Sequence, residues 1–289
     1  EVKEMKVRIY SALPEKEKQV LFELVQECNK VDRGYRLPYL DNNYNADPEM
    51  PAFFLAEMDG RTIGFLSVYA DEPGQAEVSL YVLPTYRRQG MANQLLAAFA
   101  KVADKYDLTE IEYVAELVFL NGNPDFVRRF DYQADEAEIW LAQPAQTFPL
   151  EEREGIEVMQ GSLDLAEEIA AFQSQVFETP LDVALKYARE AVSSGYSLLY
   201  ILKKDGRVVA SVSVDTDFGT NYFFGLAVNQ DFQGQGLGSY LLLASMQDLN
   251  KLNEREFQIV VEKQNSRALK LYKKLGFKEM TEVVYLKEK

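Results

Sequence analysis

Apolar residues recur at helical spacing in some stretches of the chain and gather in short continuous runs in others. Residues 14–29 show the first pattern and predict an amphipathic helix. The apolar stripe of this helix consists of Val20, Leu21, Leu24, Val25 and Cys28. Residues 53–58 and 62–69 show the second pattern, on either side of Asp59-Gly60, a dipeptide typical of a hairpin turn. The first part of the chain therefore contains both strands and helices.

The same patterns continue to the end of the chain. Further strands are predicted over residues 7–11, 78–83, 111–115, 138–141, 156–159, 198–203, 208–215, 222–228, 257–261 and 283–286. Further helices are predicted over residues 89–106, 163–177, 235–252 and 267–275. Strands joined by hairpins and followed by helical crossovers predict an α+β fold, in which helices pack against a mixed sheet.

The two halves of the chain are related by an internal repeat. When the sequence is shifted by 146 residues, 17 of the 58 pairs between residues 59–116 and residues 205–262 are identical, without a gap. A repeat of about 140 residues is far longer than a solenoid unit, so it indicates two copies of one domain. Residues 143–149 carry two prolines and no periodicity, as a linker does. We therefore expect one domain over residues 1–147 and a second over residues 150–289.

Composition excludes several classes of function. Asp and Glu total 46 against 31 Lys and Arg, and a net charge of −15 argues against a nucleic-acid partner. The chain contains no histidine, which excludes a Ser-His-Asp triad, a histidine acid and a histidine-rich metal site. Its one cysteine, Cys28, can form neither an intramolecular disulfide nor a thiolate zinc site. We expect no metal ion.

The sequence also bears on the cellular compartment. No apolar run approaches the roughly 18 residues of a membrane-spanning helix, and residues 1–10 are charged and carry no signal-peptide core. Together with the single cysteine, this favours a cytoplasmic protein without a membrane partner. Nothing in the sequence indicates an oligomeric state.

A glycine-rich turn between a predicted strand and a predicted helix is the sharpest local feature. It reads Gln233-Gly234-Gln235-Gly236-Leu237-Gly238 and follows the strand at 222–228. Such a turn aims backbone N–H groups and the positive end of a helix at one point, which favours an anion. Ser239 breaks the Rossmann pattern G-x-G-x-x-G, and the loop has no lysine for a Walker motif.

The first copy repeats this loop. Arg87-Arg88-Gln89-Gly90-Met91-Ala92 shares with it the pattern Gln/Arg-x-x-Gly-x-Gly/Ala, and in this the chain resembles the Gcn5-related N-acetyltransferase (GNAT) family. Residues 265–277 add a second similarity, because they fit the family signature Asn-x-x-Ala-x-x-Leu-Tyr-x-x-x-Gly-Phe. Asn265 can cap the start of that helix and Gly276 can end it.

The resemblance implies two tandem acyl-CoA N-acyltransferase (GNAT) folds, each a mixed, mostly antiparallel sheet flanked by helices. It implies acetyl-CoA as the acyl donor. The pantetheine arm is expected along Leu226, Ala227 and Val228, and the pyrophosphate on the N–H groups of residues 233–238 and on Ser239. Asn265 is expected beside the cofactor. The equivalent positions of the first copy are Val82, Arg87, Arg88, Gln89, Gly90, Met91 and Ala92.

The resemblance also assigns the chemistry. A primary amine attacks the thioester carbonyl, and Tyr272 protonates the departing thiolate. Because the chain lacks histidine, the base must be a carboxylate or a water held by one. Glu262 is the first candidate, followed by Asp217 and Asp215. Glu116 stands at the position of Glu262 in the first copy, which leaves open a structural role for both.

The first copy lacks the proposed acid. At the constant offset Phe126 stands opposite Tyr272, and with a one-residue deletion Val127 does. Neither side chain has a hydroxyl group. We therefore expect residues 150–289 to catalyse and residues 1–147 to be a degenerate copy, as in tandem members of the family, which look similar in this respect. Arg87 and Arg88 leave coenzyme A binding by the first copy open.

The sequence says least about the amine that accepts the acetyl group. Aromatic and acidic residues cluster in the first copy and suit a cationic amine; they are Tyr35, Tyr39, Asp41, Tyr44, Asp47 and Glu49. The second copy has a comparable set, namely Phe177, Glu178, Asp182, Tyr187 and Glu190. A solvated loop in an acidic protein is the simpler explanation of such a cluster. A non-catalytic coenzyme A-binding sensor or scaffold is the alternative function, whereas an aminoacyl-tRNA-dependent transferase conflicts with the acidic charge.

Overall fold

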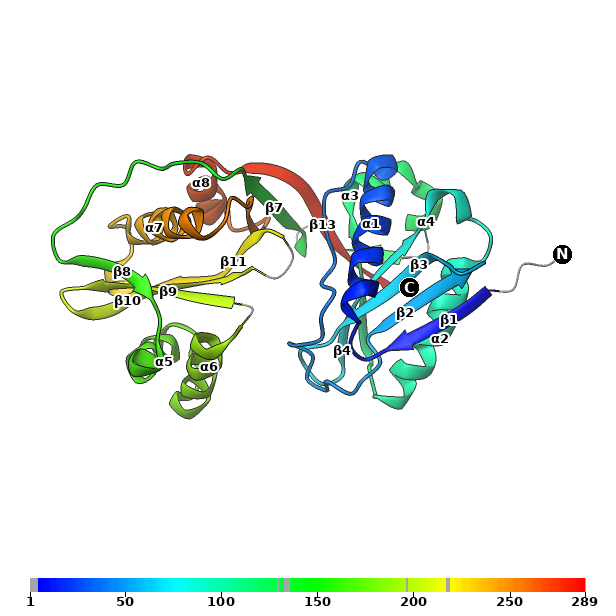
Figure 1. Ribbon diagram of the computed structural model, residues 1–289, viewed down its shortest axis with the longest axis horizontal. Helices are drawn as coiled ribbons and strands as arrows, with labels where there is room; N and C mark the ends of the chain where they lie inside the picture. Colours follow the sequence, from blue (N-terminus) through cyan, green and yellow to red (C-terminus); the bar gives the residue numbers. More distant parts are fainter. Residues whose placement is uncertain (1–4, 129, 133–135, 196, 217–218, 289) are drawn as a thin grey trace. The chain divides into compact units, whose positions relative to one another are not determined.

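The computed structural model in Figure 1 describes residues 5–128, 130–132, 136–195, 197–216 and 219–288. The chain divides into two compact units. Unit 1 consists of Glu1–Ile139 together with Thr281–Lys289, and unit 2 of Trp140–Met280. These bounds differ from the expected 1–147 and 150–289 at the last strand of each copy. The end of the first copy belongs to unit 2, and the end of the second copy belongs to unit 1.

Unit 1 contains a sheet with the strand order β1-β2-β3-β4-β5-β13, in which β4 and β5 run parallel and the other neighbours antiparallel. The strands are β1 (Met5–Tyr10), β2 (Phe53–Met58), β3 (Arg61–Tyr69), β4 (Gln75–Val82), β5 (Glu110–Glu116), β6 (Phe130–Tyr132), which pairs with β13, and β13 (Lys278–Glu288). The helices are α1 (Glu15–Asp32), a 3-10 turn (Pro84–Tyr86), α2 (Met91–Lys105), α3 (Leu117–Gly122) and α4 (Pro124–Val127).

Unit 2 contains a sheet with the order β7-β12-β11-β10-β9-β8, in which β11 and β12 run parallel. The strands are β7 (Glu138–Gln143), β8 (Ile156–Gln160), β9 (Ser197–Lys204), β10 (Arg207–Asp215), β11 (Asn221–Val228) and β12 (Phe257–Glu262). The helices are two 3-10 turns (Leu163–Leu165 and Gln230–Phe232), α5 (Ala166–Val176), α6 (Leu181–Ser193), α7 (Leu237–Leu252) and α8 (Ser266–Lys274).

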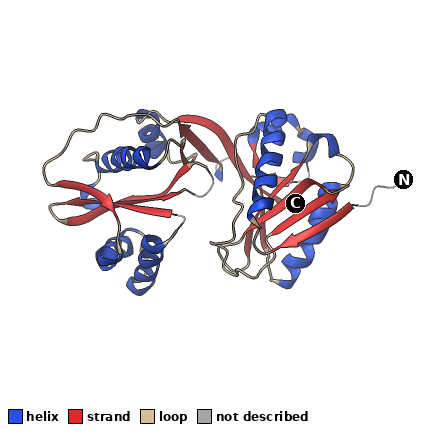
Figure 2. Cartoon of the chain, in the orientation of Figure 1, coloured by secondary structure: helices blue, strands red, loops and turns tan. Residues whose placement is uncertain are grey.

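Helices cover both faces of each sheet, as Figure 2 shows. In unit 1, β3 is buried along nearly its whole length, because α1 packs on one side and α2 on the other. The ring of Phe99 on α2 meets that of Phe54 on β2 at 6.1 Å. In unit 2, α5 and α6 bury a cluster that includes Ile169 and Ile201. Full burial of one such side chain contributes about 1.5–3 kcal/mol.

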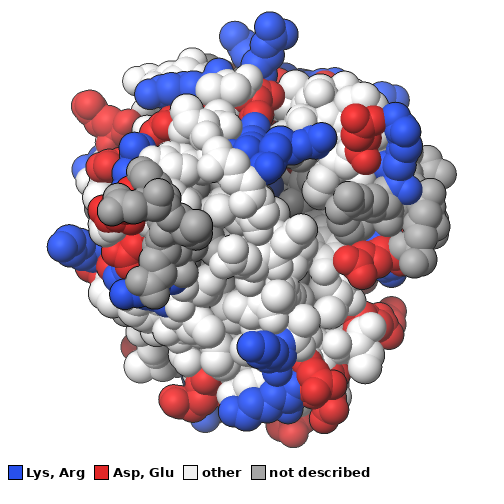
Figure 3. All heavy atoms as spheres, turned by 90° about the vertical axis from the view of Figure 1, so that its right-hand side faces the viewer, with Lys and Arg blue, Asp and Glu red and all other residues white. Residues whose placement is uncertain are grey.

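The mixed α+β architecture agrees with the expectation from sequence, but α6 was not predicted. The residues of α6 follow Pro180, and only Ala184 and Ala188 are buried. Its apolar stripe is therefore short. In Figure 3, acidic and basic side chains are interspersed around the rim of the face shown, with a wide uncharged area between them. The acidic excess does not gather on this face. None of the helices that the structure describes is both long and apolar enough to cross a membrane.

Candidate functional site

A β-bulge interrupts β11 in the middle of the unit 2 sheet. Ser211 pairs with Ala227 and Ser213 with Phe224, so Gly225 and Leu226 together face one residue of β10. Gly225 is exposed and has a φ of +62°, a conformation that suits glycine. A bulge takes backbone groups out of the ladder. It therefore leaves backbone polar groups of β11 available to a ligand.

The strands β11 and β12 separate next to this bulge. Their parallel ladder joins Asn221–Phe223 to Phe257–Ile259 and ends there, although β11 continues to Val228 and β12 to Glu262. The opening between the two strands leads to the glycine loop. An extended group bound along β11 can thus hydrogen-bond to its backbone on the way to the loop. Leu226, Ala227 and Val228, along which the resemblance implies the pantetheine arm, lie in this part of β11.

The glycine loop connects β11 to α7 and leaves the first turn of that helix uncapped. Gly234 and Gly236 have φ values of +77° and +75°. Gly236 is the N-cap of α7 and provides no side-chain hydrogen bond. The Gln233 amide donates to the Val228 carbonyl at 3.1 Å and fixes the start of the loop. The N–H groups of the first turn, including those of Gly238 and Ser239, therefore remain for an anion.

Three cationic side chains surround this loop, and none of them was expected there from the sequence. Arg153 donates to the Gln235 carbonyl at 3.4 Å and lies over the Tyr240 ring at 4.9 Å. Lys204 donates to Oε1 of Gln235 at 2.6 Å. Arg267 donates to the Gln233 side chain at 3.3 Å. Their charges face a loop that already favours an anion, in a chain that is otherwise acidic.

Tyr272 is the buried residue of α8, with 6% of its surface exposed. Its ring packs edge-on against Phe277 at 6.2 Å. Burial raises the pKa of the Tyr272 hydroxyl above its ordinary value. The group therefore stays protonated at neutral pH, as a proton donor must before the reaction.

Asn265 and Glu262 lie at the junction of β12 and α8. The Asn265 side chain caps α8 by accepting a hydrogen bond from the Ala268 N–H at 3.1 Å, which is the capping role expected from sequence. Its amide nitrogen is left for other contacts. Glu262 is exposed at the end of β12. Of the further base candidates, Asp215 ends β10, and Asp217 lies outside the described residues.

Unit 1 keeps the backbone of the glycine loop but not the bulge. Arg88 and Gly90 have φ values of +63° and +86°, which match Gly234 and Gly236. The ladder between β3 and β4, in contrast, runs without a break from Gly64–Val82 to Tyr69–Glu77. The two copies thus share a loop and differ at the centre of the sheet.

The acidic and aromatic loop of the first copy is largely engaged within unit 1. Asp41 accepts a hydrogen bond from Lys18 at 2.6 Å, and Asp47 accepts one from the Glu49 N–H at 2.9 Å. Tyr39 packs against the Tyr44 ring at 5.6 Å. In unit 2, Phe177 and Tyr187 expose 50% and 58% of their surface. The unit 2 set is therefore the more accessible of the two.

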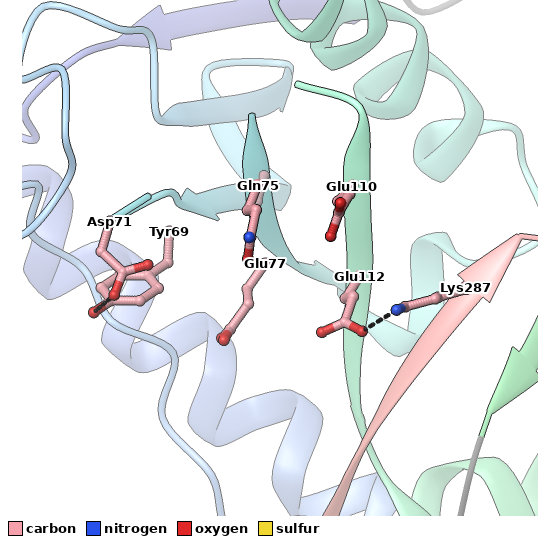
Figure 4. A pocket seen from close by; sticks show the side chains of 8 residues that line it. Tyr69, Asp71, Gln75, Glu77, Glu110, Glu112 and Lys287 are labelled. Atoms are coloured by element: carbon pink, nitrogen blue, oxygen red, sulfur yellow. Dashed lines mark hydrogen bonds and ion pairs between the residues drawn. The ribbon is translucent and has the colours of Figure 1, made fainter. Parts of the chain in front are cut away.

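An acidic pocket of about 240 Å³ lies where β3, β4, β5 and β13 meet in unit 1 (Figure 4). Its lining is Tyr69, Asp71, Gln75, Ala76, Glu77, Glu110, Glu112 and Lys287. Lys287 pairs with Glu112 at 3.0 Å, and Tyr69 donates to Asp71 at 3.2 Å. Burial, opposed by the Arg36 charge, raises the pKa of Glu77 to about 7. Glu77 is thus only partly ionised at neutral pH.

Comparison with known proteins identifies the family. The sequence matches the Acetyltransferase (GNAT) family twice, over residues 18–128 and 163–277. The chain belongs to this family. The match falls once on each copy of the repeat, so the expected tandem arrangement of GNAT domains is confirmed.

Relatives and solved structures agree with this assignment. Mycothiol acetyltransferase of Clavibacter sepedonicus is 26% identical over 243 residues, which cover 74% of this chain and 73% of that protein. A GCN5-related N-acetyltransferase from Sphaerobacter thermophilus superposes with a TM-score of 0.72 at 17% identity, over 98% of this chain and 95% of that one. A tandem GNAT protein from the clavulanic acid biosynthesis pathway superposes with a TM-score of 0.68 at 17% identity, over 99% of this chain and 98% of that one. This GNAT protein is therefore an N-acetyltransferase with the α+β fold expected from its sequence.

Proposed function

We propose that unit 2 transfers an acetyl group from acetyl-CoA to a primary amine by direct attack on the thioester. The bulge at Gly225 and Leu226 carries this proposal, because it offers backbone groups in the middle of β11, next to the glycine loop. A freed N–H donor there polarises a thioester carbonyl and stabilises the negative charge that develops on its oxygen. Unit 1 has no such interruption of its ladder.

The phosphate end of acetyl-CoA belongs at the glycine loop of unit 2. The uncapped first turn of α7 supplies backbone donors, and Arg153, Lys204 and Arg267 supply positive charge around it. A helix N-terminus with such neighbours suits a diphosphate. The pantetheine arm then runs along Leu226, Ala227 and Val228, in the opening between β11 and β12.

Two side chains carry the proton transfers in this proposal. As the amine nitrogen bonds to the carbonyl carbon, its excess proton passes to Glu262, directly or through water. The carbon–sulfur bond then breaks, and the thiolate takes a proton from Tyr272. The buried Tyr272 hydroxyl is held in its protonated form, which is the form this role requires. Bulk water returns the proton to Tyr272 and removes one from Glu262.

An aromatic row beside the bulge supports a cationic acceptor. Trp140 stacks on Tyr222 at 5.8 Å, and Tyr222 stacks on Phe224 at 6.2 Å. All three rings are partly exposed. Aromatic faces attract ammonium and guanidinium groups. Tyr222 and Phe224 directly precede Gly225 along β11, and Trp140 on β7 stacks on the first of them. An amine bound at this row therefore lies near the carbon it attacks.

The test is the release of free thiol from acetyl-CoA in the presence of a panel of amines. The panel contains a polyamine, an aminoglycoside, a lysine peptide and a peptide with a free N-terminus. We expect turnover with at least one of them, and we expect Tyr272→Phe to lower kcat about 100-fold or more while the Kd for acetyl-CoA stays near wild type. Binding of acetyl-CoA without turnover of any amine would favour a coenzyme A-binding sensor or scaffold instead.

A further inference from the structure

In unit 1 the opening between the two parallel strands already holds part of the chain. The parallel ladder between β4 and β5 ends at Val78 and Tyr113, just as the equivalent ladder between β11 and β12 in unit 2 ends at Phe223 and Ile259. The segment that follows α1 enters this opening. The backbone N–H groups of Tyr35 and Arg36 donate to the two carboxylate oxygens of Glu116, at 2.8 and 3.2 Å. This segment begins the long blue loop beyond α1 in Figure 1.

The side chain of Arg36 reaches the opposite strand. Its guanidinium donates to the Ser79 hydroxyl of β4 at 2.9 Å, and Ser79 exposes only 4% of its surface. Burial disfavours the charge of Arg36, but the surrounding Tyr81, Tyr285, Glu77 and Glu116 outweigh this and raise its pKa. Residues 35 and 36 therefore connect β5 to β4 across the opening.

The carbonyl at the end of β4 is hydrogen-bonded within its own unit, as the equivalent Val228 carbonyl is in unit 2, but here the main donor is an arginine. The Val82 carbonyl accepts hydrogen bonds from Nε of Arg87 at 2.9 Å and from the Cys28 thiol at 3.5 Å. Arg87 in turn forms a bidentate ion pair with Asp32, at 2.6 and 2.7 Å. The arginine expected to attract pyrophosphate is thus neutralised by the end of α1.

The close approach of this segment to its neighbours explains why residue 34 is a glycine. A Cβ atom on Gly34 would lie 2.5 Å from a carboxylate oxygen of Glu116 and 2.6 Å from the side-chain oxygen of Asn29. Both distances are shorter than real Cβ contacts. The Asn29 amide also donates to the Arg36 carbonyl at 3.1 Å. The segment is therefore fitted to the opening from both sides.

We propose that residues 34–36 permanently occupy the cleft of unit 1 in which the arm of coenzyme A would otherwise lie, so that the chain binds acetyl-CoA in unit 2 alone. The proposal rests on the function proposed above, since the cleft is identified through its equivalent in unit 2. Glu116 and Glu262 then have different roles at one position of the repeat. Glu116 is buried and holds the segment, whereas Glu262 is exposed and free to serve the reaction.

The internal segment gives unit 1 a stability that does not depend on ligand. The paired backbone and the Arg36 side chain connect the two diverging strands at all times. In the described part of unit 2, Glu262 makes no such connection between the strands. A ligand that binds only folded unit 2 therefore stabilises this unit to an extent that depends on the ligand concentration. Unit 1 thereby serves as a constant scaffold.

Hydrogen–deuterium exchange with and without acetyl-CoA tests the proposal. We expect acetyl-CoA to slow exchange in residues 233–241 and to leave residues 87–95 unchanged. The Tyr35 and Arg36 amides are expected to be protected in both conditions. Slowing in both loops, or unprotected Tyr35 and Arg36 amides in the wild type, would overturn the proposal.

Matched variants separate this proposal from the function on which it rests. Glu116→Gln keeps the shape of the side chain and removes its charge, and we expect at least tenfold faster exchange of the Tyr35 and Arg36 amides. Glu262→Gln at the equivalent position should leave these amides unchanged, and Gly34→Ala provides a second way to displace the segment. If Glu116→Gln does not speed exchange, the proposal is wrong. If acetyl-CoA slows neither loop but the amides respond as expected, the proposed function fails and the internal segment stands.

Discussion

The N-cap glycines of the two glycine loops offer a matched pair of substitutions. Gly236 in unit 2 and Gly90 in unit 1 occupy the same position of the repeat, with φ values of +75° and +86°. An alanine in this left-handed conformation costs about 1 kcal/mol. Gly236→Ala places its Cβ atom 3.6 and 3.8 Å from the Arg153 guanidinium, and Gly90→Ala meets nothing within 4 Å. We therefore expect both variants to lower Tm by a similar amount, about 4 °C.

Their effects on ligand binding should differ. A methyl group at position 236 stands where a phosphate approaches the uncapped N–H groups, and loss of one charge-assisted hydrogen bond corresponds to about 1.5–3 kcal/mol. Gly236→Ala should thus weaken acetyl-CoA binding about tenfold to a hundredfold, measured by calorimetry. Gly90→Ala should not change the affinity. Equal weakening by both variants, or by neither, would refute the assignment of the site to the loop of unit 2.

Three further predictions concern charge and proton transfer. Combined Arg153→Gln and Lys204→Gln substitutions should weaken acetyl-CoA binding about threefold to tenfold at low salt, with a smaller difference at high salt because salt screens exposed charges; equal effects at both salt concentrations would contradict this. Burial raises the pKa of Glu77 from 4.5 to about 7, so the stability of the folded chain that is present below pH 4.5 is lost as the pH rises through 7. Glu77→Gln avoids this loss, and its Tm should therefore rise relative to that of the wild type over this pH interval. Burial raises the pKa of the Cys28 thiol to about 11; alkylation of the folded chain at pH 8 should therefore be far slower than alkylation of the unfolded chain.

The sequence predicted those parts of the fold that depend on local patterns. The apolar stripe of α1, the Asp59-Gly60 turn and both glycine loops lie where they were expected. The repeat led to tandem GNAT domains, which the family match confirms. Each of these features is encoded within a few neighbouring residues or by comparison of two equivalent segments.

The exchange of the last strands could not be predicted in the same way. β7 and β13 have similar apolar patterns, and either one completes a sheet whose edge strand is β5 or β12. A side-chain pattern specifies a strand and the face it buries, but not the partner it pairs with. The structure assigns Trp140–Gln143 to unit 2 and Thr281–Glu288 to unit 1.

The site residues that the sequence missed act over long separations. Arg153 lies near the start of the second copy, in a stretch for which the sequence indicated no function, yet it contacts Gln235, 82 positions away. Tyr35 and Glu116, which are 81 positions apart, were considered for other roles. No local pattern indicates that the loop after α1 enters a cleft between strands. Only the folded chain brings these groups together.

The stoichiometry of acetyl-CoA binding tests the central claim most directly. Calorimetric titration of the intact chain with acetyl-CoA is expected to give one site per chain, and Gly236→Ala is expected to weaken that same site. Two sites per chain would show that unit 1 also binds the coenzyme. No binding at millimolar acetyl-CoA would contradict the proposed transferase.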